Sequence, residues 1–382
     1  MTASRRSEIA PFVVMDVMDA AARLERTGRD VLHLEVGQPS TPAPKPVLAA
    51  AARALQEDVL GYTVSTGVPA LREAIARHYA DTYGVRIAPG RICVTTGSSG
   101  AFLLAFIAAF DAGARVAVAA PSYPCYRNIL QALDVEVAQV PCGPDTRYEL
   151  TPDHLDGLGR VDGVIVASPS NPTGSMIDEA LLRDLAAWCD RRGATLVSDE
   201  IYHGVQYGRP ATTAAAVSDR AFVVNSFSKY FSMTGWRVGW MIAPEAMTRP
   251  VEKLMQNLFI SAPTLAQLAA VAAFDAKEEL DGHVARYAAN RAIILEALPK
   301  LGIERLAPPD GAFYVYADVS PWTSDSVAFC AELLQATGVA ITPGVDFDPA
   351  RGRSTVRFSY AADTASVAEA MRRLAGFVSG RR

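Results

Sequence analysis

From residue 91 onward, short apolar runs alternate with longer segments of helical periodicity. Apolar runs of this length predict buried strands, and the amphipathic segments between them predict helices. We expect strands at 92–95, 115–120, 135–140, 164–167, 195–198 and 221–227, and helices at 101–110 and 179–192 and directly after Thr151. This alternation predicts an α/β fold with a mostly parallel central sheet and helices on both of its faces.

The two ends of the chain lack this alternation. Toward the N-terminus we expect a helix over 13–24, a short strand at 31–36, a Pro-rich turn at 37–46, and helices at 46–56 and 71–83. After Arg237 the pattern becomes helical, with helices expected at 245–259, 263–276 and 279–298. The remaining residues mix strands at 312–316, 339–341 and 355–359 with helices at 326–335 and 364–377. This mixture indicates a second, smaller α+β domain.

Composition and charge restrict the possible functions. Half of the 382 residues are hydrophobic, which is ample for a large core, and the net charge of −5 gives no basic surface for nucleic acid. The five cysteines are odd in number and lack CxxC spacing, so we expect neither a disulfide framework nor a metal site, and a reducing cytoplasm fits best. The longest apolar run, 101–110, is too short to span a bilayer, and the first residues, Met1–Arg6, do not resemble a signal peptide.

Chemically capable residues follow the predicted strands at their carboxyl ends. They are the turn Gly97–Gly100, Tyr123, Asn171, Asp199 with Tyr202, and Lys229. Each has an ordinary explanation on its own, such as a helix start, a core tyrosine, a helix cap or a solvated lysine. In an open α/β sheet, however, ligands bind at the carboxyl ends of the strands. The coincidence of five such positions therefore predicts a single site.

The segment Ser226–Trp240 suggests what this site does. Lys229 ends a run that we expect to be a buried strand, and a partly dehydrated lysine has a lowered pKa and can form a Schiff base with an aldehyde. The hydroxyl of Ser226 and the guanidinium of Arg237 are suited to holding a phosphate beside it. Together these groups favour a covalently held pyridoxal phosphate.

Seven segments then carry a resemblance to a known family. They are Gly37-Gln-Pro, Tyr62 with Gly67–Arg72, Gly97–Gly100, Asn171–Gly174, Asp199–Tyr202, Ser226–Lys229 with Gly235–Gly239, and Arg357-Phe-Ser. In order and spacing they resemble the class I/II aminotransferases, pyridoxal-phosphate enzymes of fold type I, along nearly the whole chain. In that family both chain ends build the small domain. The resemblance therefore implies a small domain from 1–44 and 277–382, and a large cofactor-binding domain over 45–276.

The resemblance also implies a role for each residue around the cofactor ring. Lys229 would be the Schiff base lysine and the base that moves the substrate proton, and Asp199 would keep the pyridine nitrogen protonated. Asn171 and Tyr202 would hydrogen-bond the ring oxygen, and Tyr123 would stack on the ring face.

Phosphate and substrate contacts are implied in the same way. The phosphate would lie against a set of small, hydroxylated and cationic residues: Gly97, Ser98, Ser99, Ser226, Ser228 and Arg237. Tyr62 would reach the phosphate of a neighbouring subunit, which implies a homodimer with shared sites. Arg357 would bind the substrate carboxylate with help from Asn171 and the backbone of Gly37. From the sequence alone, a strand arginine in a surface salt bridge is the alternative for Arg357.

The leading hypothesis is a transferase of amino acid metabolism that moves an amino group from an L-amino acid to a 2-oxo acid by a ping-pong mechanism. Ser99 stands where some bacterial relatives acting on dicarboxylic amino acids carry lysine, so neutral, branched and aromatic donors stay open. Trp236, Phe313, Tyr314 and Tyr316 are either pocket walls or core residues.

Two other classes compete with this hypothesis. A β-C–S lyase or a related cyclising synthase would use the same residues, and product analysis separates it from a transaminase. A regulator built on such a domain would need a DNA-binding module ahead of Val31, where the chain is too short for one.

Overall fold

The largest element of the computed structural model is a seven-stranded sheet. The structure describes residues 2–380, so Met1, Arg381 and Arg382 lie outside the described residues. The order of the sheet is β2-β8-β7-β6-β5-β3-β4. The strands are β2 Ile92–Thr95, β3 Arg115–Ala120, β4 Glu136–Pro141, β5 Gly163–Ala167, β6 Thr195–Asp199, β7 Phe222–Ser226 and β8 Gly239–Ile242. All adjacent pairs among β3 to β7 are parallel, which confirms the predicted α/β fold with a mostly parallel sheet.

The expectation that the chain becomes purely helical after Arg237 is wrong, because β8 lies between Arg237 and the next helix. This strand runs antiparallel to both β7 and β2. Three of its four residues, Trp240, Met241 and Ile242, are apolar, but an apolar run this short does not distinguish a strand from the start of a helix. Its return direction also breaks the strand–helix alternation on which the prediction rested.

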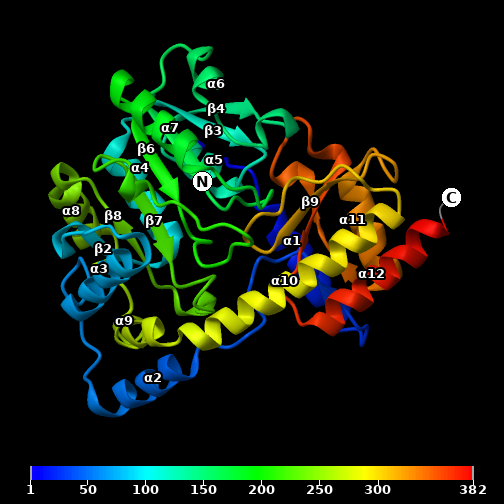
Figure 1. Cartoon of the computed structure of the whole chain (residues 1–382), viewed down its shortest axis with the longest axis horizontal. Helices are drawn as coiled ribbons and strands as arrows, with labels where there is room; N and C mark the ends of the chain where they lie inside the picture. Colours follow the sequence, from blue (N-terminus) through cyan, green and yellow to red (C-terminus); the bar gives the residue numbers. More distant parts are fainter. Residues whose placement is uncertain (1, 381–382) are drawn as a thin grey trace.

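Helices cover both faces of the sheet, as predicted (Figure 1). The alternation along β7 shows the two faces directly: Phe222 and Val224 pack into one hydrophobic cluster and Val223 into the other. On the Phe222 side lie α4 Gly97–Ala109, α5 Pro124–Ala132 and α8 Thr248–Leu258. On the Val223 side lie α2 Lys45–Glu57, α3 Pro69–Tyr83, α6 Pro152–Asp156, α7 Glu179–Arg192 and α9 Thr264–Ala270.

The two chain ends lie together beside the large sheet (Figure 1), and their side chains form a third hydrophobic cluster. A short pair joins β1 Leu32–His33 to β10 Val339–Ala340 in parallel, and an antiparallel sheet has the order β11-β12-β9. Its strands are β9 Tyr314–Asp318, β11 Thr342–Pro343 and β12 Thr355–Ser359. The helices here are α1 Val13–Glu25, α10 Lys277–Lys300, α11 Ser326–Thr337 and α12 Thr364–Ser379. The exact domain boundaries stay a prediction.

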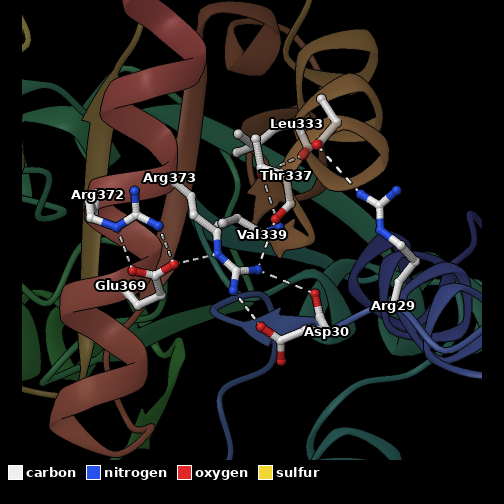
Figure 2. Close-up of polar contacts among 9 residues, drawn as sticks. Arg29, Asp30, Leu333, Thr337, Val339, Glu369, Arg372 and Arg373 are labelled. Atoms are coloured by element: carbon white, nitrogen blue, oxygen red, sulfur yellow. Dashed lines mark hydrogen bonds and ion pairs between the residues drawn. The ribbon is translucent and has the colours of Figure 1, made fainter.

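Arg373 of α12 ties this unit together (Figure 2). Its guanidinium forms an ion pair with Asp30, donates to the Thr337 carbonyl at 3.0 Å, and bonds Glu369 at 2.8 Å. Gly338 ends α11 with a φ of +74°, and a Cβ there would lie 2.2 Å from the Asp30 carbonyl oxygen. The N-terminal segment at Asp30 therefore packs directly against α11 and α12, the last two helices of the chain.

Among residues 2–380, no helix is both long enough and apolar enough to cross a membrane.

Candidate active site

The carboxyl ends of β5, β6 and β7 open onto a cavity of about 530 Å³ between the large sheet and the β9–β12 sheet. Most of the predicted site residues line it: Gly37, Ser98, Ser99, Tyr123, Asn171, Asp199, Tyr202, Ser228, Lys229, Arg237 and Arg357. Gly97 and Ser226 lie behind this lining, and Tyr62 does not line the cavity. The residues that follow the strand ends thus surround one cavity.

Lys229 reaches the cavity from the turn after β7. Its Nζ donates a hydrogen bond to the Gly37 carbonyl at 2.6 Å. Burial and, to a smaller extent, the positive charges of Arg357 and Arg237 lower the pKa of Lys229 to about 8, and Asp199 opposes them. About a tenth of this amine is therefore neutral at pH 7 and about half at pH 8, and the neutral form is the nucleophile.

Asp199 ends β6 and is 5% exposed. Its carboxylate accepts hydrogen bonds from the Tyr126 hydroxyl and, at 3.1 Å, from the Ile201 backbone N–H. Burial raises the pKa of Asp199 to about 6, and these two hydrogen bonds hold the rise in check. Sequence reasoning missed Tyr126, although its place one helical turn after Tyr123 was a usable signal.

The aromatic wall beside Asp199 comes from Tyr123, Tyr202 and Tyr314. Tyr123 is the N-cap of α5 and meets Phe12 edge-on at 5.7 Å between ring centroids. The Tyr202 and Tyr314 hydroxyls share a hydrogen bond of 2.6 Å. Tyr314 is thus a wall of the cavity.

The other aromatic residues considered as pocket walls lie elsewhere. Phe313 and Tyr316 are buried in hydrophobic clusters, so core packing is the correct alternative for these two. Trp236 is half-buried and lines a separate pocket beside Pro39 and Pro263.

An anion-binding corner forms where α4 begins. Gly97 has a φ of +71°, and a Cβ there would lie 2.6 Å from Nη2 of Arg237, so only glycine lets the guanidinium approach the helix start. Arg237 itself has a φ of +53° and donates to the Thr234 carbonyl at 3.0 Å. Backbone N–H groups at a helix start and a guanidinium together favour a bound anion.

Two serines support this corner. The Ser226 and Ser228 hydroxyls lie 2.8 Å apart and share a hydrogen bond, and the Ser226 hydroxyl lies 3.1 Å from the Val238 carbonyl. Ser226 is 1% exposed, so it holds the turn from behind while Ser228 faces the cavity.

Arg357 lies on β12 across the cavity and is 2% exposed, so the alternative of a surface salt bridge is wrong. Its guanidinium donates to Asn171 Oδ1 at 2.8 Å and to the Glu35 carbonyl. The rings of Tyr314 and Phe347 lie 4.3 and 4.7 Å from the guanidinium carbon. Its buried Nε has no hydrogen-bond partner. This rigid cation is suited to binding a carboxylate.

Gly37 is held close to Tyr314, because an added Cβ would lie only 1.7 Å from the Tyr314 hydroxyl oxygen. Its carbonyl accepts from Lys229. A glycine is therefore a packing requirement where the chain passes between the lysine and the tyrosine.

The N-terminal helix α1 supplies a wall that the sequence analysis missed. Phe12, Met15 and Met18 line the cavity with apolar side chains. Their three-residue spacing places them on one face of the helix. The spacing of these apolar residues is visible in the sequence, but nothing near them in the sequence indicates that they face a site.

Comparison with known proteins identifies the family. The family model for aminotransferase class I and II matches residues 29–374. The chain belongs to the class I and II aminotransferases. The valine–pyruvate aminotransferase of Mycobacterium tuberculosis is 53% identical over 378 residues, covering 98% of this chain and 97% of the relative.

Solved structures agree with this membership. The crystal structure of an aminotransferase from Mycobacterium tuberculosis has a TM-score of 0.98 and 52% identity, with 100% of both chains covered. A putative aminotransferase from Silicibacter pomeroyi gives a TM-score of 0.94 and 51% identity, again with 100% of both chains covered. The predicted aminotransferase class is therefore confirmed. Enzymes of this family use pyridoxal phosphate to exchange amino groups between amino acids and 2-oxo acids.

Proposed function

We propose that this aminotransferase uses pyridoxal 5′-phosphate in the Lys229 cavity to transfer the amino group of a neutral, apolar L-amino acid to a 2-oxo acid such as pyruvate. The observation that carries the choice of donor is the set of charges around the cavity. Within residues 2–380, the cationic side chains that line it are Lys229, Arg237 and Arg357. Lys229 would bind the cofactor aldehyde, Arg237 the phosphate and Arg357 the substrate α-carboxylate. None of the three remains to bind a second carboxylate on the substrate side chain.

The residues that line the cavity fit pyridoxal phosphate. Lys229 offers an amine with a lowered pKa, and Asp199 offers a buried carboxylate that would lie against the pyridine nitrogen. The corner formed by Gly97, Ser228 and Arg237 would hold the phosphate, with Ser98 and Ser99 at the start of α4. Asn171 and Tyr202 would bind the ring oxygen, and Tyr123 would stack on the ring.

When bound, the cofactor supplies an aldehyde that takes up the amino group and a ring that accepts electrons from the substrate Cα. Lys229 would take the proton from the substrate Cα and deliver it to the cofactor's C4′. The lowered pKa of Lys229 keeps a neutral fraction of this amine available for the first step. Its hydrogen bond to Gly37 fixes the position from which it acts.

Arg357 would bind the substrate carboxylate. Its guanidinium is buried, held between two rings, and already directed by Asn171. A planar cation of this kind binds a carboxylate through two parallel hydrogen bonds. The substrate Cα would thereby be placed between Arg357 and Lys229.

The substrate side chain would lie against Phe12, Met15 and Met18 of α1. Burying a valine-sized side chain there would contribute about 1.5–3 kcal/mol. A distal carboxylate against the same wall would lose its hydration without gaining a cation. The valine–pyruvate name of the mycobacterial relative supports this choice of donor.

A homodimer would complete the site. Tyr62 is 83% exposed and lies among exposed apolar side chains of the same region: Leu55 at 61%, Val59 at 97% and Val64 at 59%. A second copy would cover these residues and bring Tyr62 to its partner's phosphate. The five cysteines are free, which fits the reducing cytoplasm that we propose as the location.

A panel of amino donors with pyruvate and with 2-oxoglutarate tests the proposed substrate class. We expect kcat/KM for valine or leucine to exceed that for aspartate by about 100-fold, corresponding to about 2.7 kcal/mol. A preference for aspartate would refute the apolar donor. Formation of ammonia and pyruvate from cystathionine, with no 2-oxo acid added, would indicate a lyase.

Borohydride reduction followed by peptide mapping tests the cofactor site. The label should lie on Lys229 and disappear in Lys229→Ala. The exposed Lys277, which pairs with Asp281, provides the control variant Lys277→Ala, which should keep the label.

A further inference from the structure

The first turn of α1 is capped by a residue from the other end of the chain. The backbone N–H groups of Val13 and Val14 each donate to the Asp346 carboxylate at 3.2 Å, one to each oxygen. Phe12, the N-cap residue, forms no capping bond with its own side chain. A helix start without a local cap depends on such a distant acceptor.

Asp346 is firmly held. It ends the short helix η8 Gly344–Asp346 and is 1% exposed. Its carbonyl accepts from the buried Arg127 at 2.7 Å, and its neighbour Phe347 packs on the Arg357 guanidinium. The acceptor for α1 thus belongs to the same turn that supports the carboxylate-binding arginine.

The capped turn carries the substrate-facing wall. Phe12 meets the Tyr123 ring, and Met15 and Met18 face the cavity. Met15 is 46% exposed, so apolar packing alone restrains it weakly. The buried residues of α1 are Val14, whose own N–H is capped, and Ala21, which packs against Val31 in the second half of the helix. The cap and the burial of Val14 together hold the N-terminal end of the wall.

We propose that Asp346 is a positioning residue for donor selection: by capping α1, its carboxylate fixes the apolar wall against which the substrate side chain packs. The inference rests on the proposed function, since it assumes that donors with apolar side chains use this wall. It assigns Asp346 no contact with substrate or cofactor. Its removal should therefore affect large apolar donors and spare alanine, whose side chain is a single methyl group.

The test is kcat/KM for valine and for alanine in Asp346→Asn. Asparagine keeps one acceptor oxygen, but its NH2 group replaces the other, so one capping bond is lost and a backbone N–H is left without an acceptor; this corresponds to about a five- to thirty-fold effect. We expect kcat/KM for valine to fall by about that factor, mainly through KM, and kcat/KM for alanine to change less than about three-fold. Asp348→Asn is the matched control. Asp348 is also buried, but its carboxylate accepts from Ala350 and Arg351 of its own turn, so the valine-to-alanine ratio should stay as in the wild type.

A second variant removes one of the two capping hydrogen bonds by changing the donor in α1 instead of the acceptor. Val13→Pro deletes the N–H that donates to Asp346 and leaves the carboxylate in place. Proline is favoured at the first position of a helix, so this variant keeps the fold even where Asp346→Asn does not. It should lower the valine-to-alanine ratio by a smaller factor.

Two results would overturn the inference. One is an equal loss of kcat/KM toward valine and alanine in a variant that folds, and the other is a wild-type kcat/KM for valine in both Asp346→Asn and Val13→Pro. A wild-type enzyme that does not accept apolar donors would instead overturn the proposed function. The two failures are distinguishable because the second is visible without any substitution.

Discussion

Replacing Arg357 with lysine tests the substrate-binding geometry most directly. The guanidinium directs two parallel donors, while lysine offers one point charge on a flexible stem. Hydrogen bonds to charged groups contribute about 1.5–3 kcal/mol each. Losing one of the two therefore predicts a fall in kcat/KM of about 10- to 150-fold for every amino acid donor.

The surroundings of Arg357 add to this loss. The guanidinium lies between the rings of Tyr314 and Phe347 and also bonds Asn171 and Glu35. A lysine cannot fill that planar slot, so we expect the upper half of the range. The assay is the first half-reaction, followed by the absorbance of the bound cofactor during single turnovers with valine and with alanine.

The control is Arg353→Lys, because Arg353 lies on the same segment but its side chain is 71% exposed and pairs with Asp325 at 3.5 Å. An exposed pair of this kind contributes little, so activity should stay within about two-fold of the wild type. The assignment of Arg357 to the substrate carboxylate would be wrong if Arg357→Lys kept kcat/KM within about three-fold. It would also be wrong if the loss were as large for an amine that lacks a carboxylate.

Three further predictions address the cofactor and the assembly. The apoenzyme should take up pyridoxal phosphate faster as pH rises through about 8, because the neutral form of Lys229 then accumulates; a rate that falls with pH in stopped-flow absorbance would contradict this. Mixing inactive Lys229→Ala with Tyr62→Ala should restore activity, because one site of the mixed dimer then has both side chains intact; no gain over either parent would exclude a shared site. Gly97→Ala should weaken cofactor binding about ten-fold or more, since its Cβ would displace Arg237; an unchanged dissociation constant by equilibrium dialysis would argue against that corner.

Much of the site could be predicted from the sequence because strand ends meet at one edge of a parallel sheet. Asn171, Asp199 and Lys229 follow β5, β6 and β7, which are neighbours, so their convergence follows from topology alone. Arg357 could not be placed by that logic, since it lies on a separate sheet, and its assignment required the family resemblance.

The missed features share a physical cause. The cap of α1 joins Val13 to Asp346, and Phe12 lines the cavity together with residues that lie far from it in the sequence. Such contacts have no periodicity and no fixed spacing for a pattern to reveal. The antiparallel strand β8 was missed for a different reason, since its three apolar residues are too few to distinguish a short strand from the start of the helices that follow.

The joining of the two chain ends has a consequence for synthesis. Val13 leaves the ribosome 333 residues before the carboxylate that caps it. The sequence separation between β1 and its partner strand β10 is almost as large. At about 5–20 residues per second, ribosomal synthesis leaves the N-terminal segment without its partners for roughly 15–70 s. The large sheet can form in that interval, while the apolar face of α1 stays exposed to chaperones and to other nascent chains. The catalytic cavity is therefore closed last, when translation is nearly complete.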